Sequence, residues 1–308
     1  MLAEGSYFHG AAALSNSLIR NGFQGRIMLG YRGALPCWRG SVQPRPNAAI
    51  EAAPGVCVRF VPLDDACPRG WSLGNFKPHF MLQMAGENPE HRALWYFDTD
   101  IVITTAWHDF TRWSAAGVLL VLDLAETYMP ATHAFRLEWR LLAERAGLGH
   151  RPVEGYFCSG FLGVQAEHVS ILRAWAKLID ALADEGAEMG WLINRADKPE
   201  LAKMDQDLLN AAVMATDVPY AVLGVEAMDV FPSARIMSHA MVFDKPWRRC
   251  YIRDALIGFQ PGSPDLAFWR YADGPIRSFT PAEWKGKQRA LRVARVLRHF
   301  KQRTVREW

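Results

Sequence analysis

The most constraining feature of the sequence is an apolar stretch that ends in two aspartates. Residues 94–97 are Leu-Trp-Tyr-Phe and are followed by Asp98, a threonine and Asp100. A short apolar run rich in aromatic residues indicates a buried strand, and open α/β sheets bind ligands where such strands end. Two carboxylates this close repel each other unless a cation lies between them. The sequence therefore predicts a site for Mg²⁺ or Mn²⁺ at a sheet edge, although Asp-x-Asp is a weak motif that recurs at residues 205–207.

The composition is that of an ordinary globular protein. Half of the 308 residues are hydrophobic and 22% are charged, which is enough for a large core in one extended domain with an appendage. No apolar run approaches the roughly 20 residues of a membrane span, and the N-terminus lacks the pattern of a secretory signal. The five scattered cysteines contain no Cys-x-x-Cys pair, which is typical of free thiols. We therefore expect a cytoplasmic protein without zinc or disulfides.

The net charge of +3 is concentrated at the C-terminus. Residues 285–308 contain nine Lys or Arg and one Glu, so the rest of the chain is negative. Apolar residues at three- and four-residue spacings predict a basic amphipathic helix here; they are Ala290, Val293, Ala294, Leu297 and Phe300. Such a helix can bind peripherally to an anionic membrane, or it can be a solvated helix packed on its own domain. Nucleic acid is not expected as a partner, because the negative remainder offers no supporting groove. We expect a domain at residues 1–284 and a tail at 285–308.

Apolar periodicity predicts helices that alternate with strands along residues 1–284. This alternation implies a largely parallel, twisted sheet covered by helices on both faces. Only residues 1–3 are available for a strand before the first helix, so we expect either a short first strand or a chain that starts upstream. Residues 36–54 are rich in Pro, Gly and Asn and are expected to form a loop. The expected helices are 10–21, 76–84, 133–146, 166–184 and 205–215, and the expected strands are 26–30, 58–63, 94–98, 118–124, 156–164, 220–223 and 235–238.

A second segment with side chains that could bind a metal or a phosphate lies at residues 238–247. His239 would provide a neutral imidazole as a third ligand for a metal held by two aspartates. Lys245, six residues later, can neutralise phosphate oxygens. Together these residues predict a metal-diphosphate site. The alternative is that His239 is simply a hydrogen-bonded core residue.

Several motifs follow one another in the order typical of a known enzyme family. They are Tyr7-Phe8-x-Gly10, the strand ending Tyr96-Phe97-Asp98-Thr99-Asp100, the run Asp205-Gln206-Asp207-Leu208-Leu209-Asn210, and His239 followed by Lys245-Pro246-Trp247. This pattern resembles glycosyltransferase family 8, which includes glycogenins and lipopolysaccharide galactosyl- and glucosyltransferases, over residues 3–250. The resemblance implies a GT-A fold, that is, a Rossmann-like, mostly parallel sheet flanked by helices. It also implies Mn²⁺ (or Mg²⁺), a nucleotide-sugar donor that is usually a UDP-sugar, and retaining transfer of a hexosyl group to a glycan or glycolipid.

The resemblance also implies roles for individual residues. It implies metal coordination by Asp98, Asp100 and His239, donor binding by Ala3, Glu4, Ser6, Tyr7, Lys77 and Lys245, catalysis beside the anomeric carbon by Gln206 with Asp205, and acceptor binding by Asp123. Gln206 is a neutral amide and a poor nucleophile. We therefore expect the acceptor to attack from the face that the departing phosphate leaves. Asp205 to Asp207 could instead cap a helix, and both roles can coexist.

The sequence departs from the family pattern at several positions. Glu4 and Ser6 stand where Asp and Asn are common, Cys158 and Ser159 replace Asn and Ala, and Val242 replaces a glycine that leaves room for diphosphate. These departures leave open a catalytically degenerate relative that still binds sugar nucleotides. A phosphohydrolase of the haloacid dehalogenase type is the other alternative, because Asp98-x-Asp100 after an apolar strand also fits that motif.

Overall fold

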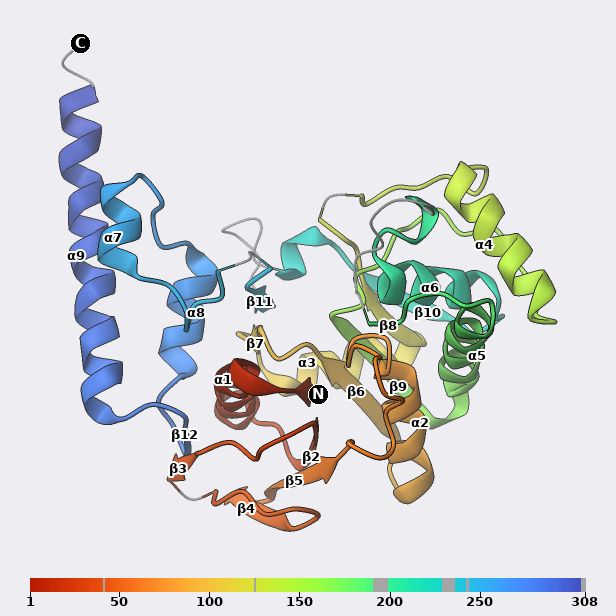
Figure 1. Ribbon diagram of the computed structural model, residues 1–308, viewed down its shortest axis with the longest axis horizontal. Coiled ribbons are helices and arrows are strands. Elements are labelled where there is room, and N and C mark those ends of the chain that lie inside the picture. Colours follow the sequence, from red (N-terminus) through yellow and green to blue (C-terminus); the bar gives the residue numbers. More distant parts are fainter. Residues whose placement is uncertain (41, 125, 191–198, 229–235, 242–243, 306–308) are drawn as a thin grey trace.

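The computed structural model describes residues 1–40, 42–124, 126–190, 199–228, 236–241 and 244–305, with side chains up to residue 297. Helices flank sheets that contain parallel strands (Figure 1). This arrangement confirms the predicted α/β fold class with a long C-terminal helix.

One sheet is built from the N-terminal quarter of the chain. Its strands are β1 (Leu2–Ala3), β2 (Gly25–Tyr31), β5 (Val56–Pro62) and β4 (Ala49–Ala53), in that order. The first three are parallel, as expected for strands joined by crossover connections.

The prediction that residues 36–54 form a loop is wrong. β4 pairs antiparallel with β5 across a turn at Gly55, whose φ is +74°, and the short strand β3 (Arg39–Gly40) precedes it. β4 is an edge strand with alternating exposure, so it lacks the continuous apolar run that indicates a buried strand.

The second sheet carries the segments that lead to the candidate site. Its strands are β10 (Tyr220–Leu223), β8 (Val118–Val121), β9 (Phe161–Gln165) and β6 (Ala93–Phe97), in that order. β8 and β10 are parallel, whereas β9 runs antiparallel to both β8 and β6. β9 begins five residues later than predicted. Residues 156–158 still bond to the end of β8, through the Cys158 amide to the Val121 carbonyl oxygen and an isolated bridge between Phe157 and Leu122.

Two small antiparallel pairs connect distant parts of the chain. β7 (Ile101–Ile103) pairs with β11 (Met237–His239), and β12 (Ile276–Arg277) pairs with β3. Ile101 lies opposite His239 in the first pair. The register of that pair therefore places His239 next to the residue that precedes β7.

The five helices predicted within residues 1–284 are all present, with ends shifted by a few residues. The first one, α1, ends at Arg20 and is followed by Gly22, which has a left-handed φ of +87° that a side chain would strain. Three short helices, α3, α7 and α8, were not predicted. The helices are α1 (Phe8–Arg20), α2 (Lys77–Glu87), α3 (Trp107–Trp113), α4 (Ala134–Arg145), α5 (Ser170–Asp184), α6 (Met204–Met214), α7 (Tyr251–Leu256), α8 (Ser263–Tyr271) and α9 (Pro281–Val305).

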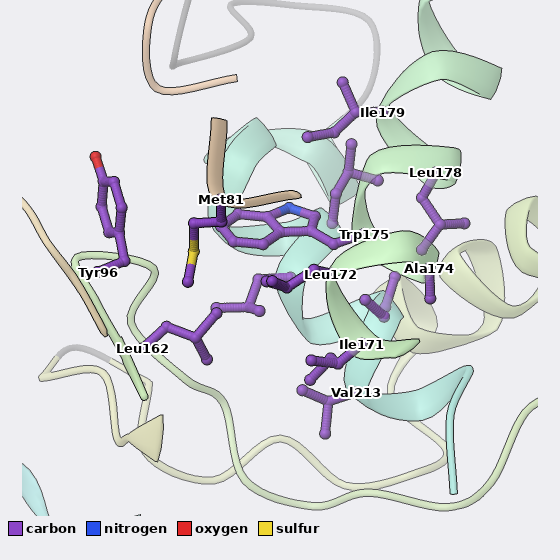
Figure 2. Packing of buried hydrophobic residues seen from close by; sticks show 14 of the residues in the cluster. Met81, Tyr96, Leu162, Ile171, Leu172, Ala174, Trp175, Leu178, Ile179 and Val213 are labelled. Atoms are coloured by element: carbon purple, nitrogen blue, oxygen red, sulfur yellow. The ribbon is translucent and has the colours of Figure 1, made fainter. Parts of the chain in front are cut away.

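The largest core cluster surrounds α5. Trp175 is fully buried among apolar side chains of α2, α5, β9 and α6, including Met81, Leu162 and Val213 (Figure 2). Its indole Nε1 donates a hydrogen bond to the Asp205 carbonyl oxygen over 3.1 Å. The core therefore positions the first turn of α6, and truncating Trp175 to alanine would cost about 3–5 kcal/mol.

The C-terminal helix packs on the rest of the chain. α9 begins at Pro281, before the predicted boundary at residue 285, and contacts α7 and α8. Leu291 and Ala294 are buried in a cluster with Trp247, Tyr251 and Trp269. Of the predicted apolar face, Ala290, Ala294 and Leu297 join this cluster, whereas Val293 is exposed; the side chain of Phe300 lies outside the described part. No helix among the described residues has the length and hydropathy to cross a membrane.

Candidate functional site

The turn between β6 and β7 carries both predicted metal-binding aspartates. The Asp98 amide donates to the Gly160 carbonyl oxygen over 2.7 Å, and the Ile101 amide donates to the Asp98 carbonyl oxygen over 3.0 Å. Helix α1 packs against this turn so closely that a Cβ at Gly10 would overlap the Thr99 carbonyl oxygen. This contact gives a physical reason for glycine in the Tyr7-Phe8-x-Gly10 motif.

Strand β11 brings His239 to the same turn. Its Nε2 lies 3.2 Å from Asp100 Oδ1, and its side chain is 8% exposed. One ligand atom from each of Asp98, Asp100 and His239 lies within 4.8 Å of the others. Burial opposes the charge on His239, but neighbouring Asp100 outweighs it and raises the pKa of His239 to about 10. Burial likewise opposes the charge on Asp100, yet His239 and Lys245 hold its pKa well below the usual range.

The residues present fit a divalent cation. Two carboxylates and an imidazole are suitable ligands for Mn²⁺ or Mg²⁺. Gly160 leaves space beside them, since a Cβ there would lie 2.9 Å from His239 Cε1 and 3.1 Å from Asp98 Oδ2. Gly160 has no positive φ that would demand glycine, so space is the reason for glycine at this position.

Two buried lysines each hold one of these aspartates. Lys245 Nζ lies 2.6 Å from Asp100 Oδ2 and 2.8 Å from the Ala240 carbonyl oxygen. Lys77, the first residue of α2, lies 3.1 Å from Asp98 Oδ1 and 2.7 Å from Asp205 Oδ2. Burial opposes the charge on Lys77, but Asp205 and Asp98 together raise its pKa well above the usual value.

The first turn of α6 faces residues 158–160. Asp205 Oδ2 accepts a hydrogen bond from Ser159 Oγ over 2.7 Å. Gln206 Oε1 accepts one from the Ser159 amide over 3.2 Å, and Gln206 Nε2 donates to Asp123 Oδ2 over 3.1 Å. Asp123 follows β8 and is buried. These contacts bring Asp205, Gln206 and Asp123 together around Ser159.

The capping alternative holds for Asp207 rather than for its two neighbours. Asp207 Oδ2 accepts the Lys203 amide at the start of α6, and Asp207 Oδ1 accepts the Tyr156 hydroxyl, both over 2.7 Å. Burial raises the pKa of Asp207 to about 7, although these hydrogen bonds favour its charged form. Asp205 and Gln206 direct their side chains to other segments and are free of this capping role.

The predicted nucleotide-binding residues divide into two groups. Ser6 Oγ accepts hydrogen bonds from Arg248 Nη2 over 2.6 Å and from Trp247 Nε1 over 3.4 Å. The ring of Tyr7 meets that of Trp247 edge-on, with 5.7 Å between centroids. These two residues thus contact the segment that follows Lys245.

The other two predicted residues face β2. Ala3 is buried opposite Tyr31, and Glu4 Oε2 forms an ion pair with Arg32 Nη2 over 2.7 Å. Glu4 and Ala3 therefore lie at the N-terminal sheet, with no described contact to the aspartates of the turn.

Sequence reasoning missed four residues at the site. Ser159 and Gly160 lay within a run that was treated only as a departure from the family pattern. Arg248 directly follows the Lys-Pro-Trp motif, whose position could have indicated it. Arg32 at the end of β2 had no signal in the sequence. Val242, the other noted departure, lies outside the described residues.

The chain is similar in structure to solved proteins, among them a bifunctional glycosyltransferase. Neither protein-family models nor curated protein sequences match the chain. The apo structure of WbbM, a bifunctional glycosyltransferase, aligns with 88% of this chain at 13% sequence identity and a TM-score of 0.48. The alignment covers 50% of the length of that protein. A likeness this distant leaves function to be argued from the chain's own residues.

Proposed function

We propose that this chain is a metal-dependent glycosyltransferase similar to family 8. It would move a hexosyl group, with retention, from a nucleotide-sugar, a UDP-sugar above all, to a glycan or glycolipid. The supporting observation is a continuous series of contacts from Asp98 through Lys77, Asp205, Ser159 and Gln206 to Asp123. The series joins the residues expected to hold metal, donor sugar and acceptor.

The donor phosphates would bind beside the aspartate turn. Asp98, Asp100 and His239 would hold Mn²⁺ or Mg²⁺, which when bound supplies Lewis acidity at the diphosphate. Lys245 neutralises Asp100 in the structure. With a cation held at the aspartates, the Lys245 ammonium would be available to stabilise the negative charge that develops on a β-phosphate oxygen during transfer.

Asp205 and Gln206 would surround the sugar. Asp205 is a poor nucleophile, because its Oδ2 is held by the ammonium of Lys77 and the hydroxyl of Ser159, each at 2.7 Å. We therefore favour attack by the acceptor hydroxyl from the leaving-group side. The bond from the anomeric carbon to the phosphate oxygen breaks, the bond to the acceptor oxygen forms, and the departing phosphate takes the acceptor's proton. Gln206, held by Ser159 and Asp123, would stabilise the positive charge on the sugar.

One assay separates this proposal from its alternatives. The purified chain is incubated with a panel of UDP-sugars, with and without Mn²⁺, and separately with an aryl phosphate. Mn²⁺-dependent release of UDP that Asp98→Asn abolishes and Arg253→Ala preserves is the expected result. Release of phosphate from the aryl phosphate alone indicates a phosphohydrolase. Mn²⁺-dependent binding of UDP without turnover indicates a degenerate relative.

The proposed acceptor also has a consequence for where the protein would act. A glycolipid acceptor would place the protein at a cytoplasmic membrane surface, to which residues 285–308 would attach it peripherally. No nucleic-acid partner is proposed.

A further inference from the structure

An apolar cavity lies between two strands that belong to different sheets. It has a volume of about 220 Å³ and is lined along its length by residues 25–28 of β2 and residues 93–97 of β6. Protein interiors contain few voids larger than a water molecule, which needs only about 10–15 Å³. We call this cavity the strand slot. Its size leaves room for a ligand.

Both strands present an edge to the strand slot. β2 pairs with β5 along its whole length, but on the other side, among the described residues, only Gly30 and Tyr31 pair with a strand, which is β1. β6 pairs with β9 on one side and with no described strand on the other. The edge of a strand carries backbone donors and acceptors, and leaving such groups unpaired away from water is costly. The slot therefore offers backbone hydrogen bonds on two sides.

Strand β1 lies at one end of the slot and sets the register of a segment that continues it. The Gly30 amide donates to the Met1 carbonyl oxygen, and the Met1 nitrogen donates to the Met28 carbonyl oxygen, each over 3.1 Å. These are alternating bonds of a parallel ladder, whose next partners on β2 are the Met28 amide and the Arg26 carbonyl oxygen. Met1 itself lines the slot. A segment in line with β1 would therefore extend a pairing that already exists.

Apolar side chains cover the slot on both faces. Met81 and Met84 of α2 line it from one core cluster, and Leu18 and Trp107 line it from the other. Strands that are buried on both faces are nearly continuous apolar runs. A folded surface could not pass between these layers, and a small apolar molecule would leave the strand edges unpaired. An extended apolar segment satisfies both the side-chain layers and the backbone.

We propose that the strand slot takes up an extended apolar segment that is joined to Met1 and continues β1. About four residues fill it, because the register of β1 places them opposite residues 25–28 of β2. The segment pairs parallel to β2 and reaches the edge of β6, and it thereby joins the two four-stranded sheets. This proposal does not depend on the proposed glycosyl transfer.

The surroundings of Met1 favour a joined segment over a separate peptide. Burial lowers the pKa of the Met1 amino group to about 5, against the opposing effect of Asp98. A joined segment turns this amine into a peptide N–H, which keeps the hydrogen bond to Met28 without an ionisable group in the interior. A separate peptide would leave the amine in place beside its own end.

Extended forms of the chain test the proposal. After a new initiator methionine, Val-Ile-Val-Ile is joined ahead of Met1 in one form and Gly-Ser-Gly-Ser in the matched control. We expect the apolar extension to raise the melting temperature by about 5 °C or more, and the control to leave it unchanged. Hydrogen exchange followed by NMR should show the Met28 amide exchanging at least about tenfold more slowly relative to the Leu29 amide, which faces β5.

A peptide added in solution distinguishes a joined segment from a separate one. Acetylated and amidated Val-Ile-Val-Ile is added to the unextended chain, and we expect it to change the melting temperature far less than the joined extension does. An apolar extension that changes neither the melting temperature nor the exchange of Met28 overturns the proposal, as does an equal gain from Gly-Ser-Gly-Ser. An equal gain from the added peptide also overturns it, by assigning the slot to a separate chain.

Discussion

Lys77 Nζ and Asp205 Oδ2 form a buried ion pair of 2.7 Å, in which the lysine side chain is 5% exposed and that of the aspartate 9%. The same ammonium lies 3.1 Å from Asp98 Oδ1. One cation thus links the turn expected to hold the metal to the residue expected beside the sugar, and each aspartate depends on it for neutralisation.

Replacing this lysine should destabilise the protein. Lys77→Ala leaves Asp205 and Asp98 without their shared cation, so we expect a loss of about 3 kcal/mol in the free energy of unfolding, measured by urea denaturation. Lys203→Ala is the control, because that lysine is 44% exposed and pairs with Asp123 over 3.3 Å; it should cost at most about 1 kcal/mol. Equal losses of unfolding free energy in both variants would mean that the buried ion pair stabilises the protein no more than the exposed one.

Asp98→Asn and Asp100→Asn should remove metal-dependent binding of UDP without unfolding the protein. Each substitution removes one anionic ligand at a turn and leaves core volume unchanged. We expect calorimetry to show at least about a hundredfold weaker affinity for Mn²⁺. An unchanged affinity for UDP in the presence of Mn²⁺ would contradict the assignment.

A substitution that only adds a methyl group should have the same effect. Gly160→Ala places a Cβ 2.9 Å from His239 Cε1 and 3.1 Å from Asp98 Oδ2, so we expect Mn²⁺ affinity to fall by about tenfold or more. Gly86→Ala is the matched control, since a Cβ at Gly86 meets nothing within 4 Å. If both variants bind Mn²⁺ like the wild type, Asp98, Asp100 and His239 do not form the metal site.

Lys245→Ala should weaken the binding of a UDP-sugar more than it weakens the binding of uridine. Uridine has no diphosphate for the lysine to contact, and Arg253→Ala, which removes an exposed cation of α7, should change neither affinity. Equal losses for the two ligands would assign Lys245 to holding Asp100 alone.

Asp207 should make the stability of the protein depend on pH. Its pKa is about 7 in the folded protein and 3.8 in the reference state, so the folded state binds the proton more tightly. Its contribution to stability is therefore full below about pH 4 and decreases as the pH rises to about 7. Asp207→Asn keeps partners for Tyr156 and Lys203 but does not ionise. We expect this variant to be more stable than the wild type at pH 8 by about 1–3 kcal/mol, with no gain at pH 4 in urea unfolding. A gain that is the same at both pH values would contradict the raised pKa.

Local patterns predicted much of the fold and part of the site. The strand before Asp98 and the helix that begins near Asp205 follow from runs and periodicities within about ten residues. The contact between Lys77 and Asp205 joins residues 128 apart, and the register of β7 with β11 places His239 beside Asp100 across a similar separation. Such pairings depend on the packing of the whole chain, so only the family resemblance could suggest them.

The resemblance also had limits. It placed Glu4 near a nucleotide base, but it could not predict that Arg32 pairs with Glu4, because nothing near Arg32 in the sequence marks it. The tail illustrates the opposite case. Its amphipathic pattern correctly predicted a helix, yet the pattern alone could not tell a stripe buried against α7 and α8 from one facing a membrane.

The contact between Gly10 and the Thr99 carbonyl oxygen has a consequence for ligand length. Ser6 and Tyr7 lie in the turn that leads directly into α1, and α1 lies against the turn that carries Asp98 and Asp100. Backbone packing therefore sets the distance between a base held at Ser6 and Tyr7 and phosphates held at the aspartates. A side chain at residue 10 would push α1 away from the turn and change that distance, so Gly10 would help to set the length of a ligand that can reach both ends.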